Sequence, residues 1–428
     1  MHKAKYLFIV IITCVLLIFS FHLNAQTISA RFTTAAYTWE QQESDTATAN
    51  HLRAYQLVQL SVGNLGLKNL SFRTFLQLSD DFVKQAKDDP RFWIYNFYFD
   101  YKKLFNAVDL SVGRQLIYAG VGYGTIDGLQ MKYGFRDYFQ IKAYVGTLAP
   151  LRKSYEIKDF KSDNLSYGVY LTTNKIKMLK IGLSYANLSR IPVRYTSPGL
   201  FTGNFRLENP EPATQKQLIG LDLSSLITKN IRFNGRLDFN LETQQVQRGE
   251  FGGRYFIKNF EAGLDFIYRM PYIDFNSVFS VFAFNPNQEV AFFANYRLNE
   301  HHFYGNFSTI MFEGDDSQRM GIGWNWKFLN LGYSKRTGYG GASDGLYATL
   351  NYFVMEKLNL SLGSNFVSFK HDLYASDRDH VLAEILGVNF NPSKYLSLQA
   401  EAQYLNNPRF SRDVRLFLRG SYALFHRF

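Results

Sequence analysis

Residues 414–428, the last of the chain, read VRLFLRGSYALFHRF. Successive side chains of a β-strand point to opposite faces, so this stretch would have one apolar and one polar face. The apolar face would carry Val414, Leu416, Leu418, Tyr422, Leu424 and Phe428, and the polar face Arg415, Arg419, Ser421 and Arg427. In a soluble β-sandwich the arginines would face the solvent, and in a membrane β-barrel they would face the lumen.

The start of the chain favours the membrane barrel. Residues 1–25 read as a secretory signal peptide, because Lys3 and Lys5 precede an apolar run and the small residue Ala25 stands directly before Gln26. We therefore expect cleavage before Gln26. An uncleaved membrane anchor is the alternative, but it would need about 20 apolar residues.

The single cysteine, Cys14, lies within this apolar run. It follows Thr13, where a lipoprotein signal would have a smaller residue, so we do not expect a lipid anchor. Removing residues 1–25 leaves 403 of the 428 residues and no thiol. Disulfides and Cys-ligated metals are therefore excluded, and we expect neither a metal nor a cofactor.

Composition favours an all-β chain. After Gln26 no segment is long and apolar enough for a transmembrane helix, and the mean hydropathy is −0.20. The chain has 40 Phe and 29 Tyr but only 10 Pro, an aromatic excess that favours pleated, half-buried surfaces. A membrane barrel gives such averages because its lipid-facing and lumen-facing residues alternate. The net charge of +11 falls to +9 without Lys3 and Lys5, which fits a solvated surface or a basic lumen.

The pattern is uniform over residues 26–428, which we predict to form one domain. Alternation places Trp93, Tyr95, Phe97, Phe99 and Tyr101 on one face of a strand, and Arg232, Asn234, Arg236 and Asp238 on the polar face of another. Short turns at 135–138, 228–230, 257–259, 298–301 and 391–394 alternate with longer connections at 79–90, 115–125, 148–163, 188–213 and 270–286. Tight periplasmic turns and long extracellular loops are typical of outer-membrane barrels.

The predicted fold is an all-β, transmembrane, antiparallel, up-and-down β-barrel of about 22 strands. Residues 243–257 and 379–390 alternate poorly, and Glu384 interrupts the second segment, so a count of roughly 16 to 20 is the alternative. An even count would place both termini on the periplasmic side. Barrels of about 22 strands usually carry a plug. No residues remain for a plug domain, so either the count is too high or the loops fold inward.

Charge assigns the lumen face. A Lys or Arg on the lipid face near mid-membrane costs about 2 to 4 kcal/mol, whereas a lumen side chain stays hydrated. The predicted pore-lining residues are Arg73, Lys132, Lys142, Lys180, Arg232, Arg236, Arg297, Lys327, Arg415 and Arg419. The acids predicted on the same face are Asp109, Asp238, Glu261, Asp265 and Glu401. The basic excess would favour anions, unless these charges only neutralise one another across strands.

A family resemblance rests on Gly-Arg-Gln at 113–115, a glycine-rich stretch at 118–124 and Asp-Gly at 127–128. This order resembles the third-loop region of Gram-negative porins and of alginate-export type barrels. The resemblance covers a small part of the chain, and the long acidic constriction loop of general porins is absent. It implies a porin-like barrel in which Arg114 and Asp127 belong to the region that narrows the pore. Alternatively, the glycines only permit a tight loop at the barrel rim.

The outward residues of the final strand carry a second resemblance. Tyr422, Leu424 and Phe428 resemble the C-terminal signal by which outer-membrane barrels are recognised for assembly, although His426 stands where an apolar residue is more usual. The resemblance implies the barrel assembly machinery and outer-membrane lipid as partners. Alternatively, Phe428 is only one aromatic residue of the interfacial girdle.

Support for catalysis is weak. The best cluster is His371, Asp372, Asp377, Asp379 and His380 in one predicted loop, where an Asp–His pair could activate water. The acids at 315–316 and the histidines at 301–302 do not complete a site. No metal-ligand spacing, phosphate-binding motif or nucleic-acid motif is present, so we expect neither an enzyme nor a nucleic-acid partner.

These patterns predict an outer-membrane, porin-like channel for passive or facilitated diffusion of small polar or anionic solutes. One alternative is an export barrel for an acidic polysaccharide. Another is a surface binding or assembly barrel whose lumen is sealed by the loop 188–213, which contains Pro192, Pro198, Pro210 and Pro212.

Overall fold

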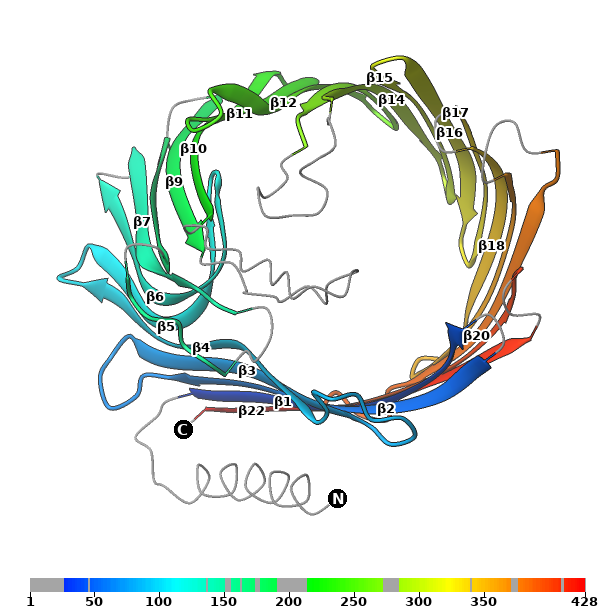
Figure 1. Ribbon diagram of the computed structural model, residues 1–428, viewed down its shortest axis with the longest axis horizontal. Helices are drawn as coiled ribbons and strands as arrows, with labels where there is room; N and C mark the ends of the chain where they lie inside the picture. The colour runs from blue at the N-terminus through cyan, green and yellow to red at the C-terminus, as the bar shows by residue number, and fades with distance from the viewer. Residues whose placement is uncertain are drawn as a thin grey trace, which may run out of the picture.

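The computed structural model describes residues 27–44, 47–135, 138–150, 155–161, 164–173, 178–190, 214–271, 285–338, 341–370, 376–408 and 412–427. These residues form 22 β-strands, and each strand pairs antiparallel with the next along the chain. β1 (Thr27–Ser44) also pairs with β22 (Asp413–Arg427). The sheet is therefore a closed, up-and-down barrel (Figure 1).

The strands between these two are long and similar in length. The first ten are β2 (Ala47–Gly63), β3 (Leu70–Asp81), β4 (Arg91–Leu104), β5 (Val108–Ala119), β6 (Gly122–Phe135), β7 (Phe139–Leu148), β8 (Leu165–Thr173), β9 (Leu179–Arg190), β10 (Thr214–Thr228) and β11 (Ile231–Asn240). The next ten are β12 (Gln245–Ile257), β13 (Phe260–Arg269), β14 (Asn287–Leu298), β15 (His301–Phe312), β16 (Asp315–Trp326), β17 (Leu329–Gly338), β18 (Ala342–Met355), β19 (Leu358–Lys370), β20 (Asp379–Phe390) and β21 (Leu396–Asn406).

The predicted all-β barrel and its strand count are confirmed, and the alternative of 16 to 20 strands is wrong. Pairing of β1 with β22 leaves no open sheet edge, which is what a strand structure needs inside lipid. Within the described ranges, no segment forms a separate plug domain, and no helix is long and apolar enough to cross a membrane.

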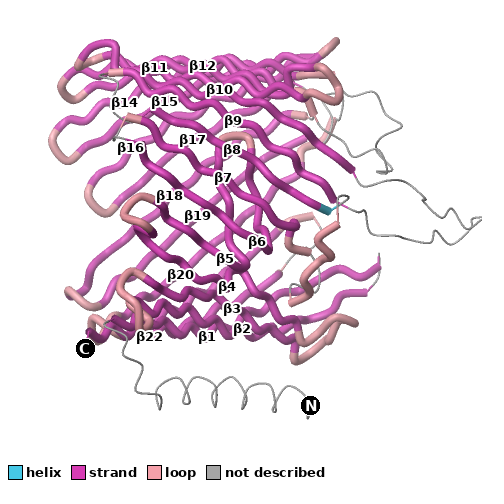
Figure 2. Tube along the Cα trace, turned by 90° about the vertical axis from the view of Figure 1, so that its left-hand side faces the viewer, coloured by secondary structure: helices cyan, strands magenta, loops and turns pink. Residues whose placement is uncertain are grey.

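The connections differ between the two ends of the barrel (Figure 2). One end, which we call the turn end, carries the short connections between β6 and β7, β10 and β11, β12 and β13, β14 and β15, and β20 and β21, where the five short turns were predicted. The described chain also begins and ends there, because Thr27 lies opposite Arg427. The loop end carries the longer connections, between β3 and β4, β7 and β8, β9 and β10, and β13 and β14.

One predicted loop is wrong. Residues 115–125 do not form a long connection, because β5 continues to Ala119 and β6 begins at Gly122. Only Gly120 and Val121 join the two strands, and Gly120 has a φ of +61°, which favours glycine. Such a residue permits a two-residue hairpin turn. The glycines that suggested a loop therefore lie in, or beside, a tight turn.

The two faces of the wall differ in polarity. Directly opposed residues of neighbouring strands share a face, so the face of each residue can be followed from strand to strand around the barrel. On the outer face Leu264, Leu386 and Leu418 are each more than half exposed, as lipid-facing residues are. Near the turn end Trp324 stacks on Trp326, at 6.2 Å between ring centroids, as in the aromatic girdle of a membrane interface.

Tyr422 and Leu424 of the predicted assembly signal lie on this outer face, opposite Phe32 and Ala30 of β1. Phe428 and the predicted signal peptide, residues 1–25, lie outside the described residues.

A β-bulge changes one predicted face. β3 and β4 shift register after Phe75, and Tyr95 is the extra residue. Trp93 lies opposite Gln77, and the Tyr95 hydroxyl donates to the same Gln77 side chain at 3.0 Å, so both rings are on the inner face. Phe97 stays on the outer face. The five alternating aromatic residues of this segment therefore do not share one face, because the inserted residue reverses the alternation.

Candidate functional site

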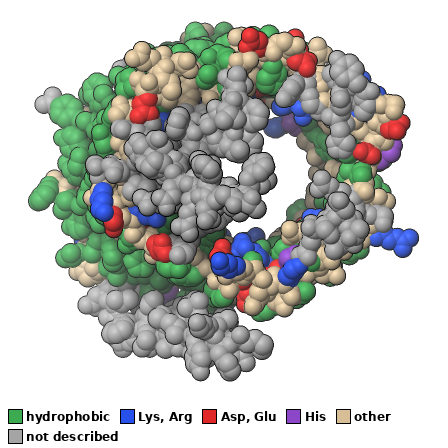
Figure 3. Space-filling model, in the orientation of Figure 1, with side chains coloured by type: hydrophobic (Ala, Val, Ile, Leu, Met, Phe, Trp, Pro, Cys, Tyr) green, Lys and Arg blue, Asp and Glu red, His purple; other side chains and the backbone are tan. Residues whose placement is uncertain are grey.

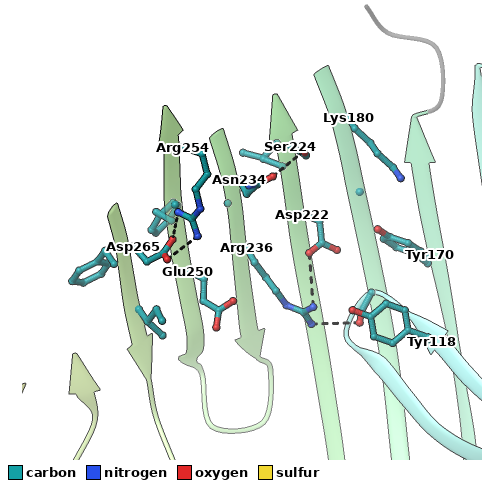
Figure 4. A pocket seen from close by; sticks show the side chains of 18 residues that line it. Tyr118, Tyr170, Lys180, Asp222, Ser224, Asn234, Arg236, Glu250, Arg254 and Asp265 are labelled. Atoms are coloured by element: carbon teal, nitrogen blue, oxygen red, sulfur yellow. Dashed lines mark hydrogen bonds and ion pairs between the residues drawn. The ribbon is translucent and has the colours of Figure 1, made fainter. Parts of the chain in front are cut away.

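A cavity of about 520 Å³ opens on the inner wall over β9 to β13 (Figure 4). Its polar lining consists of Tyr118, Tyr170, Lys180, Asp222, Ser224, Asn234, Arg236, Glu250, Arg254 and Asp265. Cross-strand pairing places the members of this set from β8 to β13 on one face of the sheet, and Tyr118 is contributed by the β5–β6 hairpin. The same face continues around the barrel and is opposite to the apolar outer face. It is therefore the lumen face.

The arginines of this cavity are paired. Arg236 Nε donates to both carboxylate oxygens of Asp238, at 3.0 and 3.1 Å, and Asp222 lies 4.0 Å from the same guanidinium. Arg254 donates twice to Asp265, at 2.7 and 2.8 Å. These arginines therefore fit the alternative that wall charges neutralise one another. Lys180 is exposed and has no carboxylate within 4.0 Å among the described residues.

The tip of the β5–β6 hairpin rests on the inner wall, beside the cavity. The Val121 amide donates to Ser184 Oγ of β9 at 3.1 Å, and Arg236 donates to the Gly120 carbonyl at 3.4 Å. Lys142 Nζ donates to the Tyr118 carbonyl at 2.8 Å. A Cβ atom on Gly120 would lie 2.3 Å from Ser184, so glycine is needed for this close approach as well. The hairpin thus occupies part of the lumen, as inward-folding loops would.

The two constriction candidates, Arg114 and Asp127, form a buried ion pair in this hairpin. Arg114 donates to both Asp127 oxygens, at 2.6 and 2.7 Å, and also to the Glu156 carbonyl at 2.8 Å. The two side chains are only 5% and 7% exposed. Asp127 lies on the face of β6 opposite to that of Lys132. The pair therefore fastens the hairpin to the connection after β7, and a direct role in narrowing the pore stays a prediction.

The structure places nearly all predicted pore-lining residues on the lumen face. These are Arg73, Lys132, Lys142, Lys180, Arg232, Arg236, Arg297, Arg415 and Arg419, together with the acids Asp109, Asp238, Glu261, Asp265 and Glu401. Lys327 is the exception, since it lies in the turn between β16 and β17 and pairs with Glu300 of a neighbouring turn at 2.9 Å. Alternation stops where the strand ends, so Lys327 is not on the wall.

Only some of these cations have a carboxylate within 4.0 Å in the described part of the chain. Arg73 lies 3.8 Å from Asp100, and Arg415 lies 2.7 Å from Asp413. Such a partner is absent, within the described ranges, for Lys132, Lys142, Lys180, Arg232, Arg297 and Arg419. Two of them are direct neighbours, because Lys132 lies opposite Lys142. The lumen therefore keeps uncompensated positive charge.

Cations also face one another directly across strands. The opposed pairs are Lys132 with Lys142, Arg232 with Arg254, Arg248 with Arg269 and Arg319 with Arg336. Like charges in opposed positions destabilise a sheet. Among the paired residues of the described strands, no two carboxylates are opposed in this way. The imbalance is therefore confined to positive charge.

Sequence reasoning missed the aromatic residues of the lumen. The inner face of β22 and β1 to β4 carries Tyr37, Trp39, Tyr55, Phe75, Trp93, Tyr95 and Phe417, which we call the aromatic wall. Tyr37 and Trp39 alternate correctly in the sequence and could have been found. Trp93 and Tyr95 could not, because the bulge at Tyr95 decides their face.

The predicted catalytic cluster gains no support. Asp379 and His380 are adjacent in β20 and therefore point to opposite faces, and His380 stacks on Phe366 at 5.6 Å. His371 and Asp372 lie outside the described residues. In the ranges that the structure describes, no three His, Cys, Asp or Glu side chains come together as metal ligands do.

No protein-family model matches the chain, and no curated protein matches it. Solved structures do match. The siderophore receptor PirA from Pseudomonas aeruginosa has a TM-score of 0.58 at 10% identity, covering 92% of this chain and 80% of the receptor. A mutant ferric enterobactin receptor, PfeA, from the same organism has a TM-score of 0.53 at 10% identity, covering 94% of this chain and 81% of the receptor. At this identity the likeness shows the fold alone, and the chain shares the closed β-barrel of outer-membrane proteins.

Proposed function

We propose that the chain is an outer-membrane, porin-like channel for passive or facilitated diffusion of small polar or anionic solutes. An apolar outer face and a charged inner face are what a barrel needs when one side meets lipid and the other meets water. The space-filling view shows hydrophobic side chains over the outer wall and an opening between the wall elements (Figure 3). Selectivity would then depend on pore radius and wall charge, without a chemical step.

The observation that carries the proposal is the positive charge of the lumen face that has no carboxylate partner, led by the opposed pair Lys132 and Lys142. Such pairs reduce sheet stability, so their retention needs another benefit. A positive field in a water-filled pore lowers the barrier for anions more than for cations. Arg236 and Arg254 contribute little net charge because each is paired with a carboxylate. Lys132, Lys142 and Lys180 would therefore contribute more to anion preference.

Reversal-potential measurements test this proposal. The purified full chain in a planar bilayer under a salt gradient should show the sign of anion preference. Replacing both Lys132 and Lys180 with Gln should move the reversal potential toward cations. Lys394→Gln is the control, because Lys394 lies in a connection at the turn end, outside the strands, and packs over the Tyr395 ring. An unchanged reversal potential in the double variant would contradict the proposal.

Two alternatives predict different currents. A barrel sealed by its loops would pass no current, and the inward position of the β5–β6 hairpin is the feature that favours this alternative. The proline-bearing part of the loop 188–213, residues 191–213, lies outside the described residues. An export barrel for an acidic polysaccharide would conduct but should be blocked by a soluble polyuronate, whereas a diffusion channel for small solutes should be affected much less.

Location and partners belong to the same proposal. We place the chain in outer-membrane lipid, delivered by the barrel assembly machinery after signal cleavage, with Tyr422, Leu424 and Phe428 as the assembly signal. Mass spectrometry of protein extracted from the membrane should find Gln26 as the first residue. Intact Met1 in the inner membrane would contradict this placement.

A further inference from the structure

The aromatic wall contains two stacks of rings. In the first, Tyr37 stacks on Trp39 at 5.7 Å, and Trp39 stacks on His51 at 4.5 Å with only 6° between the planes. Phe417 meets the edge of Tyr37 at 6.4 Å. The rings come from β22, β1 and β2, so strand pairing fixes their positions.

The second stack lies on β3 and β4. Tyr95 stacks on Phe75 at 4.7 Å and lies 6.5 Å from Trp93, with planes 26° and 17° apart. Tyr55 of β2, opposite Ser79 of β3, lies on the same inner face as both stacks. The bulge therefore places an additional ring in the lumen rather than in lipid.

These rings bury one another only in part, and their remaining surface faces the lumen. Tyr95 is 41% exposed, and the other members of the aromatic wall are half-buried. Aromatic rings on the outer face are stabilised by lipid, whereas the surface that stacking leaves uncovered in an aqueous lumen gains no apolar contact. A solute that covers the rings would supply the missing apolar contact.

Hydrogen-bonding side chains flank both stacks. Gln77 accepts from Tyr95, and Arg415 donates to the Tyr37 hydroxyl at 3.3 Å. The Arg53 guanidinium lies 5.8 Å from the centre of the Trp39 ring. Binding sites commonly combine an apolar surface with a few polar groups of this kind. A pyranose has weakly polar C–H faces and hydroxyl groups around its edge, so it could contact both the rings and the flanking groups. A purely aromatic solute would contact the rings alone.

We propose that the aromatic wall binds saccharides by stacking their pyranose rings on Tyr37, Trp39, Trp93 and Tyr95 while flanking side chains bind the hydroxyl groups. The substrates of the proposed channel would then include sugars. The inference rests on the proposed function for the route by which sugar reaches the wall. Its test does not require ionic current, so the two can fail separately.

Tryptophan fluorescence gives a direct test. The chain has four tryptophans: Trp39 and Trp93 lie on the aromatic wall, and Trp324 and Trp326 lie on the outer face. In the folded full chain with Trp324→Phe and Trp326→Phe, only the lumen rings report. Maltohexaose or cellohexaose should change the emission saturably and protect it from iodide quenching. Polyethylene glycol of similar mass has no pyranose face and should do neither.

Two variants at one position make the test specific. Deleting Tyr95 removes the bulge residue and restores regular pairing, so Trp93 keeps its face and its partner Gln77. This deletion should weaken saccharide binding roughly tenfold, because it removes one stacking ring. Tyr95→Phe keeps the ring and should bind within about threefold of the parent chain, since only the hydroxyl contact is lost. Phe307→Leu, on the outer face, is the matched control and should leave binding unchanged.

Either of two results would overturn the inference. One is the absence of a saturable response to both hexasaccharides in the folded parent chain. The other is equal affinity in the parent chain and the Tyr95 deletion. Normal conductance with either result would leave the proposed channel intact, whereas saccharide binding without any conductance would reject the channel and retain the binding wall.

Discussion

The wall formed by β6 to β13 and the wall formed by β22 and β1 to β4 present different side chains to the same lumen. The first carries charges, among them Lys142 and Lys180, whose fields extend over a Debye length of about 8 Å at physiological salt. The second also carries cations, among them Arg73 and Arg419, but it adds stacked rings such as Trp39 and Tyr95, which act only on contact. We therefore expect the first wall to discriminate by the sign of a solute's charge, and we propose that the rings of the second wall discriminate by the shape of a solute's surface.

We call the wall formed by β6 to β13 the charged wall. The largest effect is expected from breaking the buried Arg114–Asp127 ion pair of the β5–β6 hairpin, which rests on this wall. Asp127→Ala leaves Arg114 uncompensated in a site where it is 5% exposed. Removing one partner of a buried ion pair costs about 3 to 5 kcal/mol. We therefore expect the unfolding temperature to fall clearly and protease cleavage near the β5–β6 tip to increase. Saccharide binding by the aromatic wall should be unaffected.

A matched double variant sharpens this test. Arg114→Leu combined with Asp127→Leu removes both charges and should recover much of the lost stability, because no buried charge remains unpaired. Equal stability of Asp127→Ala and the parent chain would show that the hairpin does not depend on this pair.

The next effect concerns closure of the barrel, on which both walls depend. Deleting Phe428 should lower the yield of folded, heat-modifiable protein severalfold without changing signal cleavage, because each unpaired strand-edge group in hydrocarbon costs several kcal/mol. Leu386→Ala, at a lipid-facing position that is 55% exposed, should do much less. Equal folded yields from the Phe428 deletion and the parent chain would contradict the assembly role.

A smaller effect on the reversal potential is expected from charges of the charged wall that are paired with a carboxylate. Arg254→Met leaves Asp265 uncompensated and should move the reversal potential toward cations. Arg254→Met with Asp265→Leu removes the pair as a unit and should leave the reversal potential close to the parent value. If the double variant shifts selectivity as much as the single one, paired charges do contribute and our distinction is wrong.

The smallest effect is expected from salt, which should change ion selectivity at the charged wall but not saccharide binding at the aromatic wall. Raising ionic strength from about 0.1 to 1 M shortens the Debye length from about 10 to 3 Å. The difference in reversal potential between the parent chain and the Lys132→Gln, Lys180→Gln double variant should therefore shrink. The affinity of the aromatic wall for maltohexaose should change little, because stacking is not screened. A strong salt dependence of sugar binding would assign it to the charged wall.

The sequence predicted those features that depend only on alternation. The closing strand β22 with Arg415 and Arg419 on its polar face follows from a period of two, as do the inner positions of Lys132 and Arg232. The strand count followed from the regular spacing of turns. No long-range contact was needed for any of these, because side-chain direction in a strand is a local property.

Features that depend on an inserted residue or on a strand end were not predictable in this way. The bulge at Tyr95 reverses the alternation, and only the pairing of β4 with β3 reveals it. Lys327 follows the alternating pattern but lies past the end of β16. The two-residue turn at Gly120 and Val121 was not predicted, because glycines are common in both long loops and tight turns.

Single-channel recording of the purified, signal-cleaved chain in a planar bilayer tests the central claim most directly. We predict discrete conductance steps and, under a salt gradient, a reversal potential of the sign expected for anion preference. A correctly folded, heat-modifiable barrel that inserts but passes no current would contradict the account, as would an open channel that prefers cations.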